Sequence, residues 1–404
     1  MESKRMKEDI VHAALTCDDI LQEILLRLPE KSVFQLILVS KRWLRLICSS
    51  SFQYGYHTRW KSNLHFVGFF VCNLLYLGRR KNGIHRPRSE PALRLLPTCG
   101  EGDDLKFSGA LKQLGYFIDS SNGLLLCGYH PMIYRVWNPL TKQTDQLPQP
   151  QRYYKNLCVA FFTENCSDGA LHYKFIRARC ECRIVEVKTV SIEMYSSVTG
   201  TWKHFTLTCS SPFGLSPWTA ATVINGVIHW FATQGNIAIY DPRFGDRRIV
   251  LVKLPTGKLS YDYDETVLGE SSDGLLQYGQ SSNLGIEIWV LEKEEGCFSS
   301  NNISNMELKN RWNLRYRLHF KTMWKHNPNL GKPPKESQIL SFLPRNSEFV
   351  FIRSGSNIFL CHLKNKSLEA VHYTGRGNTI MWDFSKVAPY FKPVWPHSSI
   401  CDNV

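Results

Sequence analysis

The sequence predicts a multidomain α+β chain, in which a small three-helix segment is followed by an all-β, propeller-like domain of roughly six blades. Apolar side chains occur at helical spacing within residues 18–48, whereas from about residue 60 they alternate with polar ones between turn sequences. Aromatic residues make up 12% of the chain, and such flat side chains suit half-buried strands. A chain of 404 residues is also long enough for two or more separate cores.

The first predicted helix covers Asp18–Leu28 and has one broad apolar face. This face consists of Ile20, Leu21, Ile24, Leu25 and Leu28. Thr16 and Asp19 resemble a capping box, whose side chains would bond the free N–H groups of the first turn. Pro29 cannot continue a helix, so it marks the end of this one.

Two shorter helices are predicted next. Ser32 is expected to cap Val33–Leu38, and Ser40 is expected to cap Lys41–Cys48. Three short amphipathic helices within about 35 residues cannot bury all of their apolar side chains among themselves. The surplus therefore predicts a docking face for a partner, of the kind that places an apolar helix face in a groove.

The β domain is predicted from alternation and from repeated turns. Trp312, Leu314, Tyr316, Leu318 and Phe320 alternate with polar residues along Arg311–Lys321, which predicts a strand with its rings on the buried face. Tight hairpins are predicted at Asn122–Gly123, Asn225–Gly226 and Asp273–Gly274. Their spacing is a multiple of about 50 residues, which is typical of a kelch-like propeller blade of four strands. Exposed loops are predicted at Gly78–Cys99, Ser299–Asn305 and Asn327–Glu336.

The helical segment resembles the F-box of plant F-box proteins. The matching residues are Asp19, Ile24, Leu25, Leu28, Pro29, Lys31, Ser32, Val39, Ser40, Lys41, Trp43 and Ile47. The strand-and-turn units, such as Ser120–Gly128, resemble the F-box-associated domain that follows in this family. We therefore expect an F-box at residues 12–52 and an F-box-associated, β-propeller-like substrate-recognition domain at 60–390. One departure is that Thr16–Cys17 stands where the family has Leu-Pro.

The resemblance implies a substrate-recognition subunit of an SCF-type ubiquitin ligase. Such a protein binds the adaptor subunit, and through it the cullin scaffold, with its F-box, while its β domain holds a protein substrate for ubiquitination. It is not an enzyme, so no catalytic residue, cofactor or metal is expected, and we expect it in the cytoplasm, the nucleus or both. Adaptor contacts are expected at Ile20, Ile24, Leu25, Leu28, Pro29, Val39, Ser40, Lys41 and Trp43.

The alternative hypothesis is a nucleic-acid- or glycan-binding propeller whose helices are only a structural cap. Lys309–Lys335 contains eight Lys or Arg residues, no Asp or Glu, and several aromatic residues. Strand alternation places those rings opposite the arginines, so we do not expect nucleic acid as a partner. The net charge of +14 permits an acidic partner without requiring one. A sugar-binding shelf would have to come from Trp218, Trp230, Trp289 or Trp382.

Signals for an enzyme or a metal site are weak. Cys180, Cys182 and His172 lack the second ligand pair that completes a zinc site. The chain contains neither G-x-S-x-G nor H-E-x-x-H. His229 lies in an apolar strand, where packing is the simpler explanation. No run of about 18 apolar residues predicts a membrane span.

Overall fold

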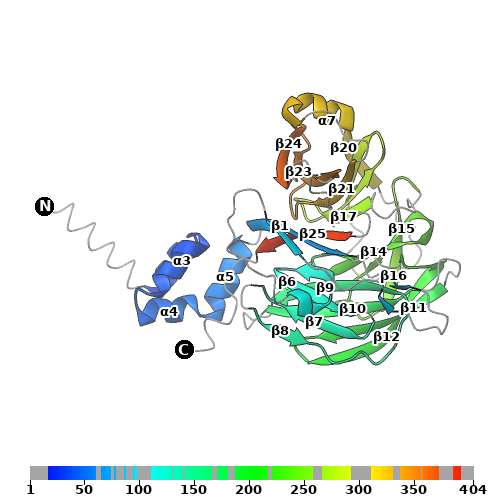
Figure 1. The fold of residues 1–404 in the computed structure, drawn as a ribbon. Coiled ribbons are helices and arrows are strands. Elements are labelled where there is room, and N and C mark those ends of the chain that lie inside the picture. The colour runs from blue at the N-terminus through cyan, green and yellow to red at the C-terminus, as the bar shows by residue number, and fades with distance from the viewer. Residues whose placement is uncertain are drawn as a thin grey trace. The chain divides into compact units, whose positions relative to one another are not determined.

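The computed structural model divides the chain into two compact units (Figure 1). The first contains the residues up to His65, together with Thr163–His172 and Phe391–Val404, and the second contains Phe66–Phe162 and Tyr173–Tyr390. Helices dominate the first unit and sheets the second. The structure describes residues 17–60, 65–73, 77–78, 86–87, 94–97, 111–129, 131–139, 142–165, 171–180, 187–216, 221–257, 266–292, 311–330, 337–355, 357–372 and 385–392.

The described part of the first unit contains four helices: α2 (Asp18–Leu25), α3 (Glu30–Ile37), α4 (Lys41–Ile47) and α5 (Ser50–Trp60). Their shared core is made of Leu21, Leu25, Leu26, Val33, Ile47, Phe52 and Tyr56. Helix α5 was not predicted, because its apolar residues are few and are separated by polar ones. Two hydrogen bonds hold it in place, from Tyr56 Oη to the Leu28 carbonyl at 2.9 Å and from Trp60 Nε1 to the Leu26 carbonyl at 2.8 Å.

The predicted helix cap is confirmed at α4 and wrong at α3, and the cap residue predicted for the first helix lies outside the described residues. Ser40 caps α4, since its Oγ accepts a hydrogen bond from the Trp43 N–H at 3.3 Å. Helix α2 starts after Cys17, which makes no side-chain cap, and Thr16 lies outside the described residues. Helix α3 starts directly after Pro29, so Ser32 lies inside its first turn. The fixed φ of proline, −65° here, suits the start of a helix.

In its described part, the second unit contains sheets of three or four strands, one eight-stranded sheet and the small β2-β3 pair. The eight-stranded sheet consists of two four-stranded halves joined by β12 and β16. With each half counted separately there are six units that we call blades 1 to 6, in agreement with the expected number of about six. Blade 1 has the order β25-β1-β4, with β25 Ser385–Lys392, β1 His65–Asn73 and β4 Arg94–Pro97. Blade 2 has β5 Tyr116–Ser121, β6 Leu124–Tyr129, β7 Ile133–Trp137 and β8 Thr144–Gln146. Blade 3 has β9 Leu157–Asn165, β10 Leu171–Arg179, β11 Val187–Ser196 and β12 Thr201–Phe213.

The remaining blades repeat the four-stranded antiparallel pattern. Blade 4 has β13 Thr222–Ile224, β14 Val227–Ala232, β15 Asn236–Tyr240 and β16 Arg248–Lys253. Blade 5 has β17 Thr266–Glu270, β18 Leu276–Ser281, β19 Gly285–Glu292 and β20 Arg311–His319. Blade 6 has β21 Ser337–Phe342, β22 Phe349–Ser354, β23 Asn357–His362 and β24 Ser367–His372. Small elements join them: β2 Leu77–Gly78, β3 Arg86–Pro87, α6 Leu111–Leu114, η1 Thr233–Gly235, α7 Phe320–His326 and η3 Pro328–Leu330.

Contacts between successive blades close them into a ring. Strand β17 contacts both β13 and β21, so the first strands of neighbouring blades lie beside one another. The last described strand, β25, completes blade 1 next to β1, and its Tyr390 packs edge-on against Phe70. Blade 1 meets blade 6 through Phe69, whose ring centroid lies 5.0 Å from that of Phe351. This closure protects the edges of an otherwise open set of sheets.

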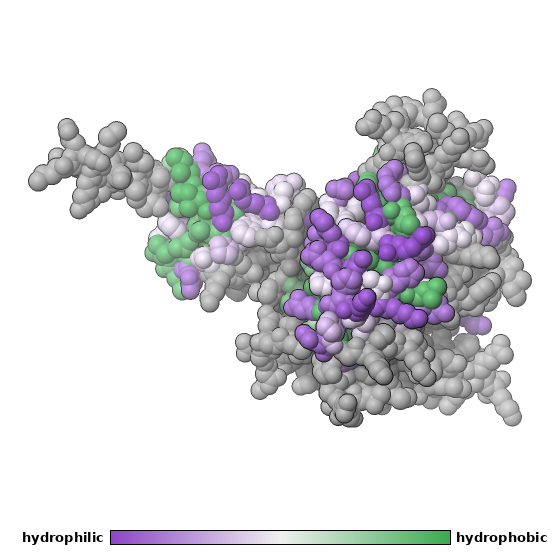
Figure 2. Space-filling view, turned by 90° about the horizontal axis from the view of Figure 1, so that it is seen from above, coloured by the Kyte–Doolittle hydropathy of each residue, from purple (hydrophilic) through white to green (hydrophobic). Residues whose placement is uncertain are grey.

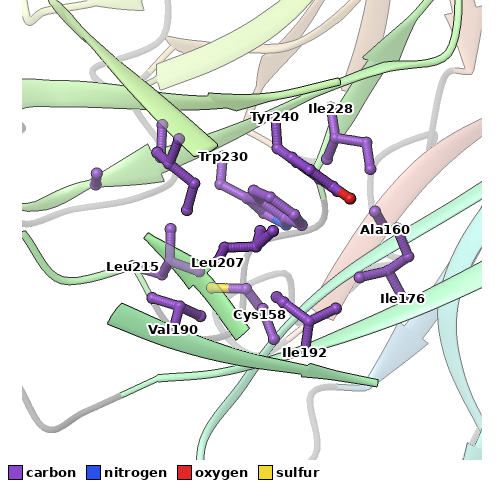
Figure 3. Close-up of a cluster of buried hydrophobic side chains, with 14 of the residues drawn as sticks. Cys158, Ala160, Ile176, Val190, Ile192, Leu207, Leu215, Ile228, Trp230 and Tyr240 are labelled. Carbon is purple, nitrogen blue, oxygen red and sulfur yellow. The ribbon is translucent and has the colours of Figure 1, made fainter. Parts of the chain in front are cut away.

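Tryptophan residues join neighbouring blades by the same kind of bond. Trp202 Nε1 donates to the Pro148 carbonyl at 2.8 Å, and Trp312 Nε1 donates to the Lys253 carbonyl at 2.7 Å. Both acceptors lie at the Leu-Pro sequences that end β8 and β16. Figure 3 shows the core between blades 3 and 4, where Trp230 points toward Leu207 and Cys158. These tryptophans are therefore parts of the scaffold.

The turn predictions are confirmed twice and modified once. Asn122–Gly123 and Asn225–Gly226 both have positive φ at both residues, as a tight hairpin of this type requires. At Asp273–Gly274 only the glycine has positive φ. A longer turn forms there, since the Gly274 N–H bonds the Ser271 carbonyl.

One loop prediction, at 78–99, and one strand prediction, at 311–321, need correction. Residues 94–97, within a predicted loop, form β4. Strand β20 ends at His319, and Phe320 begins α7. Leu314 is 37% exposed, because a bulge at Arg315 interrupts the register with β19. The predicted loop at 299–305 lies outside the described residues.

Candidate functional site

The helical unit exposes apolar side chains that its own core does not use. Ile20 and Ile24 on α2 are 47% and 42% exposed, and Leu38 and Val39 at the α3–α4 turn are 88% and 58% exposed. We call these four residues the apolar helical surface. Figure 2 shows hydrophobic residues gathered over this unit. Such exposure is costly in water, since burying a side chain of this kind contributes about 1.5–3 kcal/mol.

The helix spacing explains why these residues face outward. On α2, Leu21 and Leu25 point into the core, so Ile20 and Ile24, one position earlier in each turn, lie toward the outside. The α3–α4 turn is fixed by a hydrogen bond from the Val39 N–H to the Leu36 carbonyl at 3.1 Å.

An ion pair also fixes α4 relative to α2. The Arg42 guanidinium lies 2.7 Å from the Asp18 carboxylate, and both side chains are largely exposed. An exposed pair of this kind contributes little to stability. It links the start of α2 to α4, while the shared apolar core holds the two helices together.

The structure places the nine predicted contact residues at different depths. Leu25 is fully buried in the core, so it supports the surface from beneath. Leu28 and Trp43 are half-buried and pack against the same core. The other six are exposed: Ile20, Ile24, Pro29, Val39, Ser40 and Lys41.

The sequence prediction missed Leu38, the most exposed of the apolar residues. It was assigned to the end of the second predicted helix, Val33–Leu38, and was not included among the expected adaptor contacts. Helix α3 instead ends at Ile37, so Leu38 belongs to the turn. The sequence did contain a signal that Leu38 is exposed. It stands directly before Val39 and the Ser40 cap, so the helix has ended and no further turn can bury its side chain.

In the described part of the β domain, the polar residues singled out in the sequence do not form a reactive cluster. His229 is buried, its Nδ1–H donates to the Thr222 carbonyl at 3.1 Å, and burial lowers its pKa to about 4. It is therefore a packed neutral histidine, as predicted. Within the described part of the chain, no group of three or more His, Cys, Asp or Glu residues could hold a metal ion. Likewise, no described helix has the length and apolar character needed to cross a membrane.

The aromatic residues considered for ligand binding are mostly used in packing. Trp230 is completely buried and Trp289 is 8% exposed, so neither offers a flat face to a sugar. Trp218 and Trp382 lie outside the described residues. In the basic segment, Phe320 and Trp324 are buried against each other, and the Trp312 indole is bonded to blade 4. These three rings are unavailable for stacking on bases.

Comparison with known proteins agrees with this architecture. Residues 105–395 match the family described as F-box protein At3g26010-like, beta-propeller, and residues 17–54 match the F-box domain. F-box protein At5g03970 of Arabidopsis thaliana is 44% identical over 396 residues, which cover 97% of this chain and 91% of the relative. F-box protein At5g07610 of the same plant is 29% identical over 250 residues, covering 53% and 51%. The chain belongs to the F-box proteins in which the F-box is followed by a β-propeller of this family.

Proposed function

We propose that this protein is the substrate-recognition subunit of an SCF-type ubiquitin ligase. Its F-box binds the adaptor, and through it the cullin scaffold, and its propeller binds a protein substrate. The chain itself makes and breaks no bonds. It promotes ubiquitination by tethering the substrate near the ubiquitin carrier, which raises their effective concentration.

The observation that carries this proposal is the apolar helical surface of the F-box. The helical core is already filled, so Leu38 and Val39 are not needed to stabilise the isolated unit. An apolar groove on an adaptor would bury them together with Ile20 and Ile24. The exposed Lys41 lies directly beyond this turn and suits the polar rim of an interface.

Adaptor binding by the full chain tests the proposal. The double variant Leu38→Asp/Val39→Asp places charge on the apolar helical surface without changing the core. We expect it to bind purified adaptor at least 100-fold more weakly in calorimetry, which corresponds to about 3 kcal/mol. Leu28 is a poorer choice for substitution, because it is half-buried and packs against the helical core.

A matched control is available in the propeller. Val198, in the β11–β12 turn, is 60% exposed, which is close to the 58% of Val39. Val198→Asp should leave adaptor affinity within twofold of the wild type. Unchanged binding by the double variant, or no binding by the wild type, would reject the receptor role and favour the alternative in which the helices are only a cap.

A further inference from the structure

We propose that the outer strand of blade 5 binds an extended acidic segment of a protein, which adds beside β20 as a fifth strand. The inference rests on the proposed function, because the bound segment would belong to the substrate. It concerns a side of the propeller for which the sequence suggested only a solvated basic face. Strand β20 and helix α7 form this side, and the two elements contact each other (Figure 1).

The first reason is that β20 is a long edge strand. It is the last strand of its sheet, and it spans nine residues, Arg311–His319. Among the described strands, none pairs with its outer side. By contrast, the last strands of blades 3 and 4, β12 and β16, pair with each other. The last strand of blade 2, β8, has only three residues. An edge as long as β20 offers backbone donors and acceptors to an added strand.

The second reason is the charge along this edge. Arg315, Arg317 and His319 are exposed at alternate positions of β20, and Lys321 and Lys325 are exposed on α7. Arg317 pairs with Glu287 of β19 at 2.5 Å, yet its side chain is still 60% exposed. The segment 309–335 contains no Asp or Glu. The edge therefore carries more positive charge than its own sheet neutralises.

Helix α7 holds its lysines firmly at this side of the propeller. Asn327, which ends the helix, donates from Nδ2 to the Lys366 carbonyl at 2.8 Å. Its Oδ1 accepts from the Leu368 N–H at 3.0 Å. These bonds fix the helix against blade 6, where the exposed Lys364 extends the basic surface and the exposed Glu369 is the nearest acid on β24.

The spacing of the charges favours a strand of polypeptide over a nucleic acid. Beyond the bulge at Arg315, the residues Arg317 and His319 occupy alternate positions of β20, and such residues lie about 7 Å apart on one face. A peptide with acids at every second position would place each carboxylate near one basic side chain, and such cross-strand pairs are favourable. A single-stranded nucleic acid would also need exposed rings for stacking, but Phe320 and Trp324 are buried.

The same charges would oppose pairing of this edge with a second copy of itself. Two β20 strands side by side would bring arginines together, and repulsion opposes that pairing. An acidic strand reverses the sign of the interaction. The basic residues then exclude like-charged edges and select an oppositely charged partner.

Fluorescence anisotropy on the purified full chain tests the inference. The probe is a labelled nonapeptide with Glu at alternate positions and Thr or Val between them. We expect it to bind at least tenfold more tightly than a peptide of the same composition with contiguous Glu residues. N-methylation of alternate backbone amides should weaken binding at least tenfold, since it removes the donors that an added strand needs.

Charge variants identify the binding side. Arg315→Glu/Lys321→Glu should weaken peptide binding at least tenfold. The control Lys188→Glu/Lys203→Glu makes the same change in net charge at exposed positions of blade 3, and it should stay within twofold of the wild type. Equal losses in both double variants, or no effect of N-methylation, would overturn the inference. Tighter binding of a single-stranded oligonucleotide, lost in the same variant, would overturn it in favour of nucleic acid.

Adaptor affinity measured on the same preparations separates this inference from the proposed function. If the adaptor binds and the peptide does not, the edge-strand inference fails and the receptor role stands. If the peptide binds with the expected dependence on Arg315 and the adaptor does not bind, the receptor role fails and peptide binding is a property of the propeller alone.

Discussion

A buried ion pair within blade 3, whose arginine also bonds a turn of blade 2, offers a sharp test of how the propeller is held together. The side chains of Arg177 and Glu193 are completely buried, with Nη1 and Oε2 2.5 Å apart. Glu193 Oε1 also accepts from the Arg152 N–H at 3.0 Å, and Arg177 Nη2 donates to the Pro131 carbonyl at 2.8 Å. The guanidinium lies 5.3–5.8 Å from the ring centroids of Tyr134, Tyr154 and Trp202.

Replacing Arg177 with Met removes the charge but keeps much of the volume. The Glu193 carboxylate is then buried without its partner, and a loss of this kind costs about 3–5 kcal/mol of unfolding free energy. The double variant Arg177→Met/Glu193→Gln also removes the unpaired carboxylate charge, while the Gln oxygen can still accept a hydrogen bond from the Arg152 N–H. We expect the double variant to lower the unfolding free energy by about 1–3 kcal/mol, because the Pro131 and Arg152 carbonyls lose their donor but no unpaired charge remains.

Urea unfolding followed by tryptophan fluorescence measures both variants against the wild type. The slope of unfolding free energy against urea concentration should not change, since the variants and the wild type expose the same surface area on unfolding. The double variant should be more stable than Arg177→Met alone, which is the signature of a coupled pair. A cost below about 1 kcal/mol for the single variant, or a double variant less stable than it, would refute this reasoning.

Two further predictions concern the packing of single residues. His229 has its pKa lowered to about 4, so the unfolded chain takes up a proton first as the pH falls below about 6.5. Between pH 6.5 and pH 4, the unfolding free energy of the wild type should fall by up to about 3 kcal/mol more than that of His229→Gln. An equal pH dependence of the two proteins in urea unfolding would contradict this. At Gly279, an added Cβ would lie 2.8 Å from Ile339 Cδ1 and 2.9 Å from Phe342 Cζ. Gly279→Ala should therefore cost about 1–3 kcal/mol, whereas Gly245→Ala, with open space around the Cβ, should be nearly neutral in the same measurement.

Local patterns were enough to predict most of the elements. The Ser40 cap and the positive-φ turns at Asn122–Gly123 and Asn225–Gly226 depend on neighbours a few residues away, and all three formed as predicted. Helix α5 was missed because its stability comes from bonds to the distant Leu26 and Leu28 carbonyls. A sequence pattern contains no record of such partners.

The predicted binding residues show the same division. Helical spacing identified Ile20 and Ile24 on the outer face of α2, where they are exposed. It also selected Leu25, which is completely buried in the core, and it did not select Leu38. Leu25 is buried because of the way α2 packs against the other helices, and Leu38 is exposed because α3 ends one residue before it.

The sequence by itself determined the two-part organisation, the F-box, the repeated strands and the tight turns, because each depends on the order of residues close together in the chain. Only the tertiary structure decided which residues share a core and which face water. Arg177 is the clearest case: in the sequence it is one of several basic residues in a strand, yet a distant carboxylate and two carbonyls make its complete burial possible. Burial of a charge is stable only where such partners converge, and only the fold brings them together.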